Sequence, residues 1–392
     1  MKAFVLGAGA SKGVGYPLGY ELFDEIDSFV RNSGRMIDRF SYHQDWPALC
    51  KWLESNTNPL IATAYLNRQL EHLCTELDMA KMLRIDGLAA VVRAGDKGQT
   101  AVASAEEDCK AIHKATNDYP RHRQVLLWAL EQYLTFKHHS DAETEGGPQW
   151  DTLVKLGRKL RSGDFVITFN YDATIERVLL HEGKWSPKDG YGFELVFWKR
   201  VLPGIDASAV DFGTSAVKIL HLHGATGWYH KPVFREGYVP SGAGAVASED
   251  LSPAPLGTPI SLDPMFLQDL GVAAVDASLP RSPTDESQIL IHPTFLKNYE
   301  MESNDGSTDV FTDLWKVAAS ALREAERVYI IGYSLPAADS AALTLFLTNC
   351  DRGRVEIVNP DVAANHRLRS LLSTDTMGSP QSFEKWLDTV PG

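Results

Sequence analysis

Asn170, Asp172 and His223 are the residues whose types and positions in this sequence best suit bond cleavage. Asn170 and Asp172 belong to a T-F-N-Y-D run at 168–172, which continues an apolar stretch but has no apolar periodicity of its own. The amide of Asn170 could hold a hydroxyl group or a water molecule, and the carboxylate of Asp172 could accept an amide hydrogen bond or stabilise developing positive charge. His223 could act as a general base near neutral pH, where an imidazole titrates.

Asp172 and His223 each have a second interpretation. Asp172 directly precedes residues 173–176, a favourable first turn of a helix, and could simply cap that helix. His223 and His221 are expected on the same face of one strand, where two imidazoles could bind a metal ion, but no Asp, Glu or Cys ligand lies nearby in the sequence. We therefore expect no metal site, a structural role for His221 and a chemical role for His223.

A glycine turn follows the first apolar run of the chain. Residues 3–6 are apolar and lead into Gly7-Ala8-Gly9-Ala10-Ser11, which is typical of a buried parallel strand that ends in a tight turn. The turn carries the first two glycines of a dinucleotide-binding fingerprint, with Lys12 where a third glycine is expected. Gly9 would let a pyrophosphate approach backbone N–H groups, and Ser11 could donate a hydroxyl hydrogen bond. The alternative is a plain tight turn.

Strands and helices alternate along much of the chain. Apolar runs at 165–168, 217–222, 328–331 and 355–358 predict strands, and periodic runs at 18–34, 173–180, 309–325 and 338–347 predict helices. This alternation predicts an α/β fold with a Rossmann-like, doubly wound and mostly parallel sheet. Ligands of such sheets bind at the carboxyl ends of the strands. Small or polar residues gather there, including 332–334 and Asn359.

Two segments interrupt the alternation. Residues 35–150 have helical punctuation, such as Asn58 before Pro59, and predict an α-helical insertion between the 1–34 and 151–392 parts of one catalytic domain. Residues 231–287 are rich in Pro, Gly, Ser and Ala and are too long for a plain connection. They predict a long flexible loop in the catalytic domain, acting as a lid or as a partner-binding segment.

Composition excludes several classes of function. The 392 residues include 38 Lys and Arg and 51 Asp and Glu, and the resulting net charge of −13 disfavours non-specific binding to nucleic acid. No apolar run approaches the roughly 18 residues of a membrane span, so we expect a cytoplasmic protein that does not enter a membrane. The cysteines are widely spaced and predict neither a zinc site nor a disulfide framework. They are Cys50, Cys74, Cys109 and Cys350.

Taken together, these clusters resemble the sirtuin superfamily. The matching residues, which also follow the family's order along the chain, are 7–11 with Gly15-Tyr16-Pro17, 168–172, His223-Gly224, 332–335 and Val358-Asn359. The L-H-G-A-T-G-W run at 222–228 and the I-G-Y-S-L run at 331–335 are more similar to a bacterial sirtuin-like branch. Many members of that branch are linked to antiphage defence and hydrolyse NAD. The resemblance covers residues 1–17 and about 164–360 and leaves the helical insertion unexplained.

The resemblance implies roles for individual residues. It makes Asn170 and His223 the catalytic pair, with Asp172 near the nicotinamide amide. It puts Gly7, Gly9 and Ser11 on the NAD phosphates, and Ser334 and Asn359 around the adenosine half. The full set of implied NAD-binding residues is Gly7, Ala8, Gly9, Ser11, Asp172, Gly332, Ser334 and Asn359.

Two departures from the family pattern disfavour peptide deacylation. Protein deacylases carry a zinc module built from cysteine pairs after the His-Gly, and this chain has no cysteine between Cys109 and Cys350. Leu18-Gly19-Tyr20 stand where acidic and arginine residues usually follow the Gly-x-Pro element.

The resemblance therefore implies an NAD glycohydrolase that cleaves NAD to nicotinamide and ADP-ribose in bacterial antiphage, abortive-infection defence. A freely active NADase would kill its host. We therefore expect control by homo-oligomerisation, by a ring-forming ATPase or another defence-system partner, by the helical insertion or by the 231–287 loop. The alternatives are a catalytically silent NAD or ADP-ribose sensor or scaffold subunit, and an NAD-dependent protein deacylase or ADP-ribosyltransferase.

Overall fold

The computed structural model describes residues 1–32, 42–56, 58–79, 119–144, 150–187, 189–193, 213–230, 260–262, 288–291, 293, 310–336, 339–373 and 380–390. Its centre is a five-stranded sheet with strand order β3-β2-β1-β7-β8 and parallel pairing throughout. The strands are β1 (Lys2–Leu6), β2 (Phe165–Thr168), β3 (Lys218–His221), β7 (Arg327–Ile331) and β8 (Val355–Val358).

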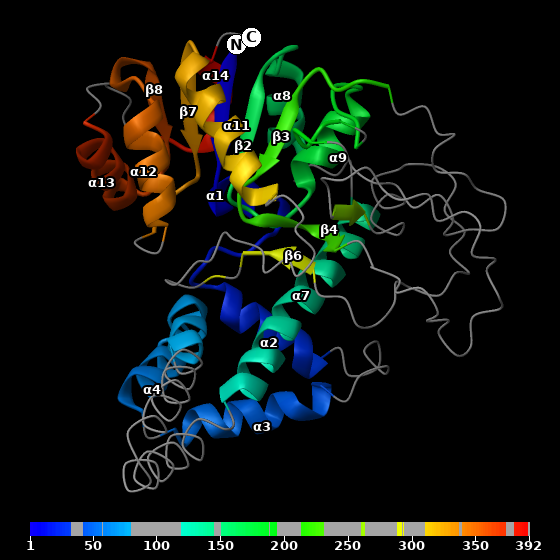
Figure 1. Ribbon diagram of the computed structural model, residues 1–392, viewed down its shortest axis with the longest axis vertical. Coiled ribbons are helices and arrows are strands. Elements are labelled where there is room, and N and C mark those ends of the chain that lie inside the picture. The colour runs from blue at the N-terminus through cyan, green and yellow to red at the C-terminus, as the bar shows by residue number, and fades with distance from the viewer. Residues whose placement is uncertain are drawn as a thin grey trace, which may run out of the picture.

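Helices cover both faces of this sheet (Figure 1). Helices α8 (Asp151–Lys159) and α9 (Thr174–His181) pack together, and α14 (Phe383–Thr389) packs on α8. Helix α11 (Val310–Glu324) contacts α12 (Ser340–Asn349) on the opposite face, and α13 (Val362–Leu372) lies against β8. The strand order reverses direction at β1, so right-handed crossovers put the two helix groups on opposite faces. The predicted Rossmann-like, doubly wound α/β fold is confirmed.

The register aligns the carboxyl ends of all five strands. Leu6, the last residue of β1, lies opposite Thr168 of β2 and Ile331 of β7. Thr168 in turn lies opposite His221, and Ile331 lies opposite Val358. Each of these is the last residue of its strand, so the segments that follow them meet along one edge of the sheet. In Figure 1 this edge faces the helical part of the molecule.

A small antiparallel sheet lies between the large sheet and the helices (Figure 1). Strand β4 (Gly224–His230) pairs with β5 (Ile260–Leu262) on one side and with β6 (Gln288–Leu290) on the other. Strand β5 falls within the segment predicted to be a long flexible loop, and pairing with β4 gives these three residues regular structure. The rest of that segment, 231–259 and 263–287, lies outside the described residues.

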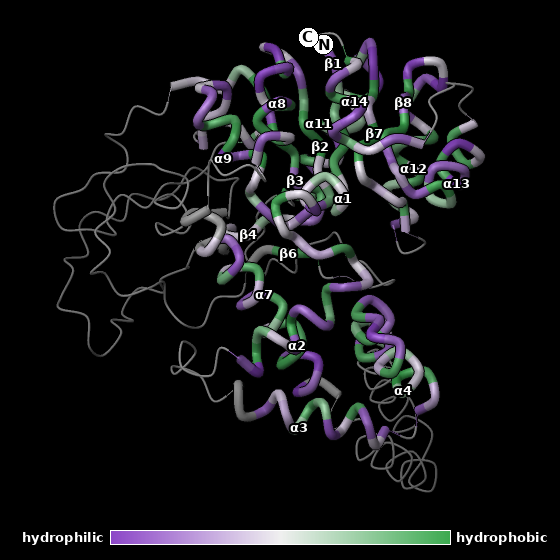
Figure 2. Tube along the Cα trace, turned by 180° about the vertical axis from the view of Figure 1, so that it is seen from behind, coloured by the Kyte–Doolittle hydropathy of each residue, from purple (hydrophilic) through white to green (hydrophobic). Residues whose placement is uncertain are grey.

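Helices α2 (Leu22–Asn32), α3 (Tyr42–Glu54), α4 (Pro59–Leu66) and α7 (Tyr119–Thr144) surround a second hydrophobic core. The amide oxygen of Asn58 caps α4 by accepting from the Leu60 N–H at 3.0 Å, as the Asn-Pro pair predicts. Hydrophobic and hydrophilic residues alternate along α2 and α3 in Figure 2, as expected for helices with one buried face. Phe23 and Ile26 bury α2 in this second core, although α2 belongs to the segment that the sequence assigned to the α/β domain.

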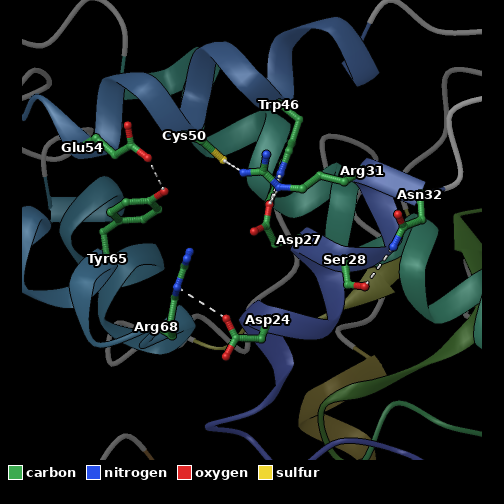
Figure 3. A network of polar contacts seen from close by, with 10 residues as sticks. All are labelled: Asp24, Asp27, Ser28, Arg31, Asn32, Trp46, Cys50, Glu54, Tyr65 and Arg68. Carbon is green, nitrogen blue, oxygen red and sulfur yellow. Dashed lines mark hydrogen bonds and ion pairs between the residues drawn. The ribbon is translucent and has the colours of Figure 1, made fainter.

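A polar network fastens α2 to α3 (Figure 3). The Asp27 carboxylate accepts a 2.6 Å hydrogen bond from Arg31 Nε and a 2.9 Å hydrogen bond from Trp46 Nε1. Trp46 is only 1% exposed, so this carboxylate satisfies an indole N–H inside the helical core.

Side chains on both sides join α7 of the helical part to the α/β part. Arg177 of α9, 1% exposed, donates a 2.6 Å hydrogen bond to the backbone oxygen of His138 and also contacts that imidazole. Lys137 Nζ lies 5.4 Å from the ring centroid of Tyr16, in the loop after the glycine turn. The helical part is thus packed beside the carboxyl edge of the sheet. No helix within the described ranges is both long enough and apolar enough to cross a bilayer.

Candidate functional site

The glycine turn lies at the switch point of the sheet, between β1 and β7. Gly7 follows β1, and its N–H donates a 3.0 Å hydrogen bond to Ile331 O; the short helix α1 (Ala8–Ser11) begins immediately after it. A Cβ atom on Gly7 would lie 2.5 Å from the Cα of Tyr333. The Gly9 N–H donates a 2.9 Å hydrogen bond to Gly332 O. Close contact with the 332–333 turn therefore requires both glycines, and a phosphate bound here would depend on N–H groups other than that of Gly9.

Asn170 follows β2 and reaches across to this turn. Its Nδ2 donates hydrogen bonds of 3.1 Å to Gly7 O and 3.1 Å to Ser11 Oγ. A carbonyl oxygen can only accept, so the contact with Gly7 fixes which way the amide points. Asn170 is partly exposed, and its Oδ1 is left as an oriented acceptor for a hydroxyl group or a water molecule. The structure thus brings Gly7, Gly9, Ser11, Asn170 and Gly332 together.

Asp172 lies beside this group and makes the contacts of a helix cap. It is 6% exposed, and its Oδ1 accepts hydrogen bonds from the backbone N–H of Thr174, at 3.2 Å, and from the Thr174 hydroxyl group. Burial raises the pKa of Asp172, and hydrogen bonds from Thr174 and Ser11 partly offset that rise. The contacts with Thr174 suit a cap at the start of α9, whereas the hydrogen bond with Ser11 links Asp172 to the glycine turn. The role of Asp172 towards nicotinamide stays a prediction.

His221 and His223 point to different partners, in contrast to the sequence-based expectation that they share one strand face. Strand β3 ends at His221, and residues 222–223 form the turn into β4, which begins at Gly224 with φ of 77°. The turn breaks the two-residue alternation of the strand, so the two imidazoles separate.

His221 forms a buried pair with Glu176 of α9, and both side chains are 0% exposed. Its Nε2 is hydrogen-bonded to Glu176 Oε1, and its Nδ1 lies 3.1 Å from Asn170 O. Burial alone would lower the pKa of His221, but the charge and hydrogen bond of Glu176 outweigh burial and raise it. Because both neighbours are acceptors, the doubly protonated imidazolium suits this position. His221 therefore supports the backbone of Asn170, in keeping with its expected structural role.

His223 lies in an aromatic setting next to one carboxylate. It is 4% exposed, and its ring makes an edge contact with Phe169 at a centroid distance of 5.1 Å. Its Nε2 lies 3.6 Å from Oδ1 of Asp339, the residue before α12. The other oxygen of Asp339 accepts a 2.6 Å hydrogen bond from the Tyr333 hydroxyl group.

Ser334 and Asn359 lie at the neighbouring ends of β7 and β8. Ser334 is exposed, and its backbone oxygen accepts from the guanidinium of Arg367. Asn359 is 6% exposed; its Nδ2 donates to Tyr333 O at 3.3 Å, and its Oδ1 accepts from Asp361 N at 3.0 Å. Asn359 therefore holds the 332–335 turn in place, and its contact with adenosine remains a prediction.

Asp339 and Glu176 were not anticipated from the sequence. Glu176 lies within a predicted helix, where a carboxylate is usually solvated, and Asp339 is more than 100 positions away from His223. A buried imidazole needs an acceptor, which is the one signal that could have prompted a search for these partners.

The sequence matches no protein-family model and no curated protein. Among the residues that the structure describes, no three His, Cys, Asp or Glu side chains gather as a metal site. Because a doubly wound sheet supports many activities, function has to be inferred from the site itself.

Proposed function

We propose that this protein is an NAD glycohydrolase that binds NAD along the carboxyl edge of the sheet, at the switch point between β1 and β7. One observation carries the proposal: the Asn170 amide is fixed by Gly7 O and Ser11 Oγ, so its oxygen is presented as an acceptor at that switch point. Open α/β sheets bind their ligands at this position. The resemblance of the surrounding motifs to sirtuin-like proteins supports NAD as the ligand.

Cleavage of the bond between nicotinamide and ribose requires few catalytic groups from the protein. The nicotinamide ring of NAD is cationic, so cleavage of its bond to the ribose C1′ returns the electron pair to the ring nitrogen and releases neutral nicotinamide. The C1′ atom becomes oxocarbenium-like, a water oxygen bonds to it, and the water loses a proton. In this proposal Asn170 holds the ribose and the water, and His223 accepts a proton from a ribose hydroxyl group or from that water.

The position of His223 favours a second candidate. At 4% exposure the imidazole is nearly closed to solvent, as expected for a site that binds NAD or ADP-ribose without turnover, or for an enzyme held inactive. A sensor or scaffold subunit of a defence complex therefore remains the alternative. The proposed controls are self-association, a ring-forming ATPase or other defence partner, and the helices packed against the site.

The test is chromatographic. The purified full chain is incubated with NAD, with and without an acetylated peptide, and nicotinamide and ADP-ribose are quantified. Asn170→Ala is the test variant, and Asn32→Ala, whose exposed amide contacts only Ser28 Oγ among the polar contacts described for it, is the matched control. Loss of a positioned catalytic group costs on the order of 10²- to 10⁴-fold in rate.

Nicotinamide and ADP-ribose formed without peptide, and lost only in Asn170→Ala, would support the NADase. Release of nicotinamide that requires the peptide would favour deacylation instead. NAD binding without release of nicotinamide in either arm would favour the sensor.

A further inference from the structure

We propose that Glu176 is a positioning residue for the reaction, which acts through His221 to hold the peptide carbonyl group of Asn170 as long as His221 carries both ring protons. The proposal rests on the proposed function for the reaction that Asn170 serves, but the protons of His221 can be measured without it.

Asn170 is held through both its backbone and its side chain. Its N–H donates a 3.0 Å hydrogen bond to Thr168 Oγ1, and its Nδ2 donates to the glycine turn at Gly7 O and Ser11 Oγ. Its carbonyl oxygen lies 3.1 Å from Nδ1 of His221. Among these contacts, the one with His221 involves the side chain that titrates near neutral pH. A change in the protonation of His221 therefore reaches the proposed catalytic amide directly.

The partners of His221 determine which of its nitrogens carry protons. A carbonyl oxygen can only accept, so Nδ1 must donate to Asn170 O. Nε2 is hydrogen-bonded to Glu176 Oε1, and both of these side chains are 0% exposed. A carboxylate beside a buried imidazole favours the imidazolium, which donates to both neighbours.

In the contacts described, Asp172 and Tyr191 are the other ionisable groups near this imidazole. Burial opposes a charge on His221, Glu176 is the strongest influence that favours it, and Asp172 at the start of α9 adds a smaller one. The Tyr191 ring lies 5.9 Å from the imidazole, centroid to centroid. Burial and the charge of Glu176 raise the pKa of Tyr191 well above its usual value, so Tyr191 stays neutral. Glu176 is therefore the group that keeps the second proton on His221.

Loss of that proton would reverse the contact with Asn170. The Glu176 carboxylate can only accept, so a neutral His221 keeps its remaining proton on Nε2. The Nδ1 lone pair then faces Asn170 O, and two acceptors 3.1 Å apart repel each other. The pKa of His221 is raised, so the contact is fully present below the reference value of about 6.5 and is lost as pH rises through the folded value. NAD cleavage should therefore fall at alkaline pH.

Glu176→Gln separates the charge of this side chain from its shape. Without the charge the buried imidazole is neutral, and the glutamine amide can turn its NH₂ group toward Nε2. The single proton then stays on Nδ1, and the contact with Asn170 O is kept. Glu182→Gln is the matched control, because Glu182 follows the same helix and pairs with the exposed Arg158.

Two measurements are made from about pH 6 to about pH 10, a range that begins below the reference pKa of histidine. Nitrogen-15 NMR of histidine-labelled protein identifies the protonated nitrogens, and the signals of His221 are assigned by their loss in His221→Gln. The kcat for NAD cleavage is measured over the same range.

We expect His221 in the wild type and in Glu182→Gln to change from two ring protons to one on Nε2 as pH rises. The kcat of both proteins should fall roughly tenfold or more over that change, since a hydrogen bond from a charged group is replaced by a repulsion. In Glu176→Gln we expect a single proton on Nδ1 throughout and no such fall. The wild-type titration is itself a test if Glu176→Gln does not fold.

A wild type whose neutral His221 carries its proton on Nδ1, or whose His221 keeps one state across the range, overturns the proposal. The predicted proton states without an alkaline fall in kcat, or a fall that persists in Glu176→Gln, overturn the positioning role and leave the NADase intact. A wild type that releases no nicotinamide but shows the predicted proton states overturns the NADase while retaining the link from Glu176 to Asn170.

Discussion

The backbone N–H of Gly9 donates a 2.9 Å hydrogen bond to the carbonyl oxygen of Gly332. This bond joins the turn after β1 to the turn after β7 at the point where the strand order reverses. A Cβ atom on Gly9 would lie 2.8 Å from the Cα of Gly332. Close packing of the two turns therefore requires glycine at position 9, independently of any bound ligand.

Gly9→Ala should destabilise the fold by about 1–3 kcal/mol, because the added methyl group must displace the 332 backbone. A glycine-to-alanine substitution normally stabilises a helix, so a loss of stability in Gly9→Ala would identify the clash. Gly13→Ala is the control, since a Cβ at that position meets nothing within 4 Å. Urea denaturation measures both variants, and equal stabilities would contradict the proposed clash.

Asn170→Asp should be less stable than Asn170→Ala. An aspartate places an oxygen 3.1 Å from Gly7 O, where the amide nitrogen now donates, so two acceptors face each other. The two facing oxygens repel each other, whereas alanine removes the side-chain group altogether and leaves Gly7 O with its 2.8 Å hydrogen bond from the Ala10 N–H. Thermal and urea unfolding of the two variants decide the order, and an Asp variant as stable as the wild type would show that the amide is oriented differently.

Stability should fall as pH rises through the range in which His221 titrates. Its pKa is raised in the folded protein, so the folded state binds the additional proton. The stability that this proton contributes is fully present below the unfolded pKa of about 6.5 and is lost as pH passes the folded value. His221→Gln should lack this fall, whereas His181→Gln, at the exposed end of the same helix as Glu176, should retain it. The predicted fall is tested by measuring the free energy of unfolding of the wild type and both variants from about pH 5.5 upward. This range begins below the reference pKa of histidine.

Asp27→Ala should loosen the helical core, because Trp46 Nε1 and Arg31 Nε lose their shared acceptor (Figure 3). Removing the partner of a buried donor costs about 1–3 kcal/mol. Asp24→Ala is the control on the same helix: Asp24 is 63% exposed, its contact with Arg68 is 3.4 Å long, and exposed ion pairs contribute little. Unfolding monitored by circular dichroism measures the stability of both variants. Equal losses of unfolding free energy in Asp27→Ala and Asp24→Ala would contradict the role given to Asp27.

Local patterns predicted the sheet well. The strands expected at 165–168 and 355–358 have those bounds in the structure, because each is a short apolar run with clear polar flanks. The helix expected from residue 18 begins at Leu22 instead. The Glu21 side chain accepts from the Leu18 N–H at 2.8 Å and pairs with Lys12, which holds residues 18–21 in a turn.

The site was predictable only in part, because its pairings span long stretches of sequence. The polar strand ends identified Asn170 and His223, and parallel strands place such ends along one edge. Nothing local indicates that Glu176 meets His221 or that Asp339 faces His223, since those contacts depend on how α9 and α12 pack onto the sheet.

Arg177 limits how this chain can be truncated. Arg177 is 1% exposed, and its described contacts are a hydrogen bond to the backbone oxygen of His138, on α7, and contacts with the imidazole of that residue. A shortened gene product without residues 35–150 would strip Arg177 of those contacts, and it would also expose the face of α2 that bears Phe23 and Ile26. Excision of the helices should therefore yield an aggregation-prone fragment, whereas a variant that also carries Arg177→Met and a polar α2 face has a better chance of being recovered in folded form.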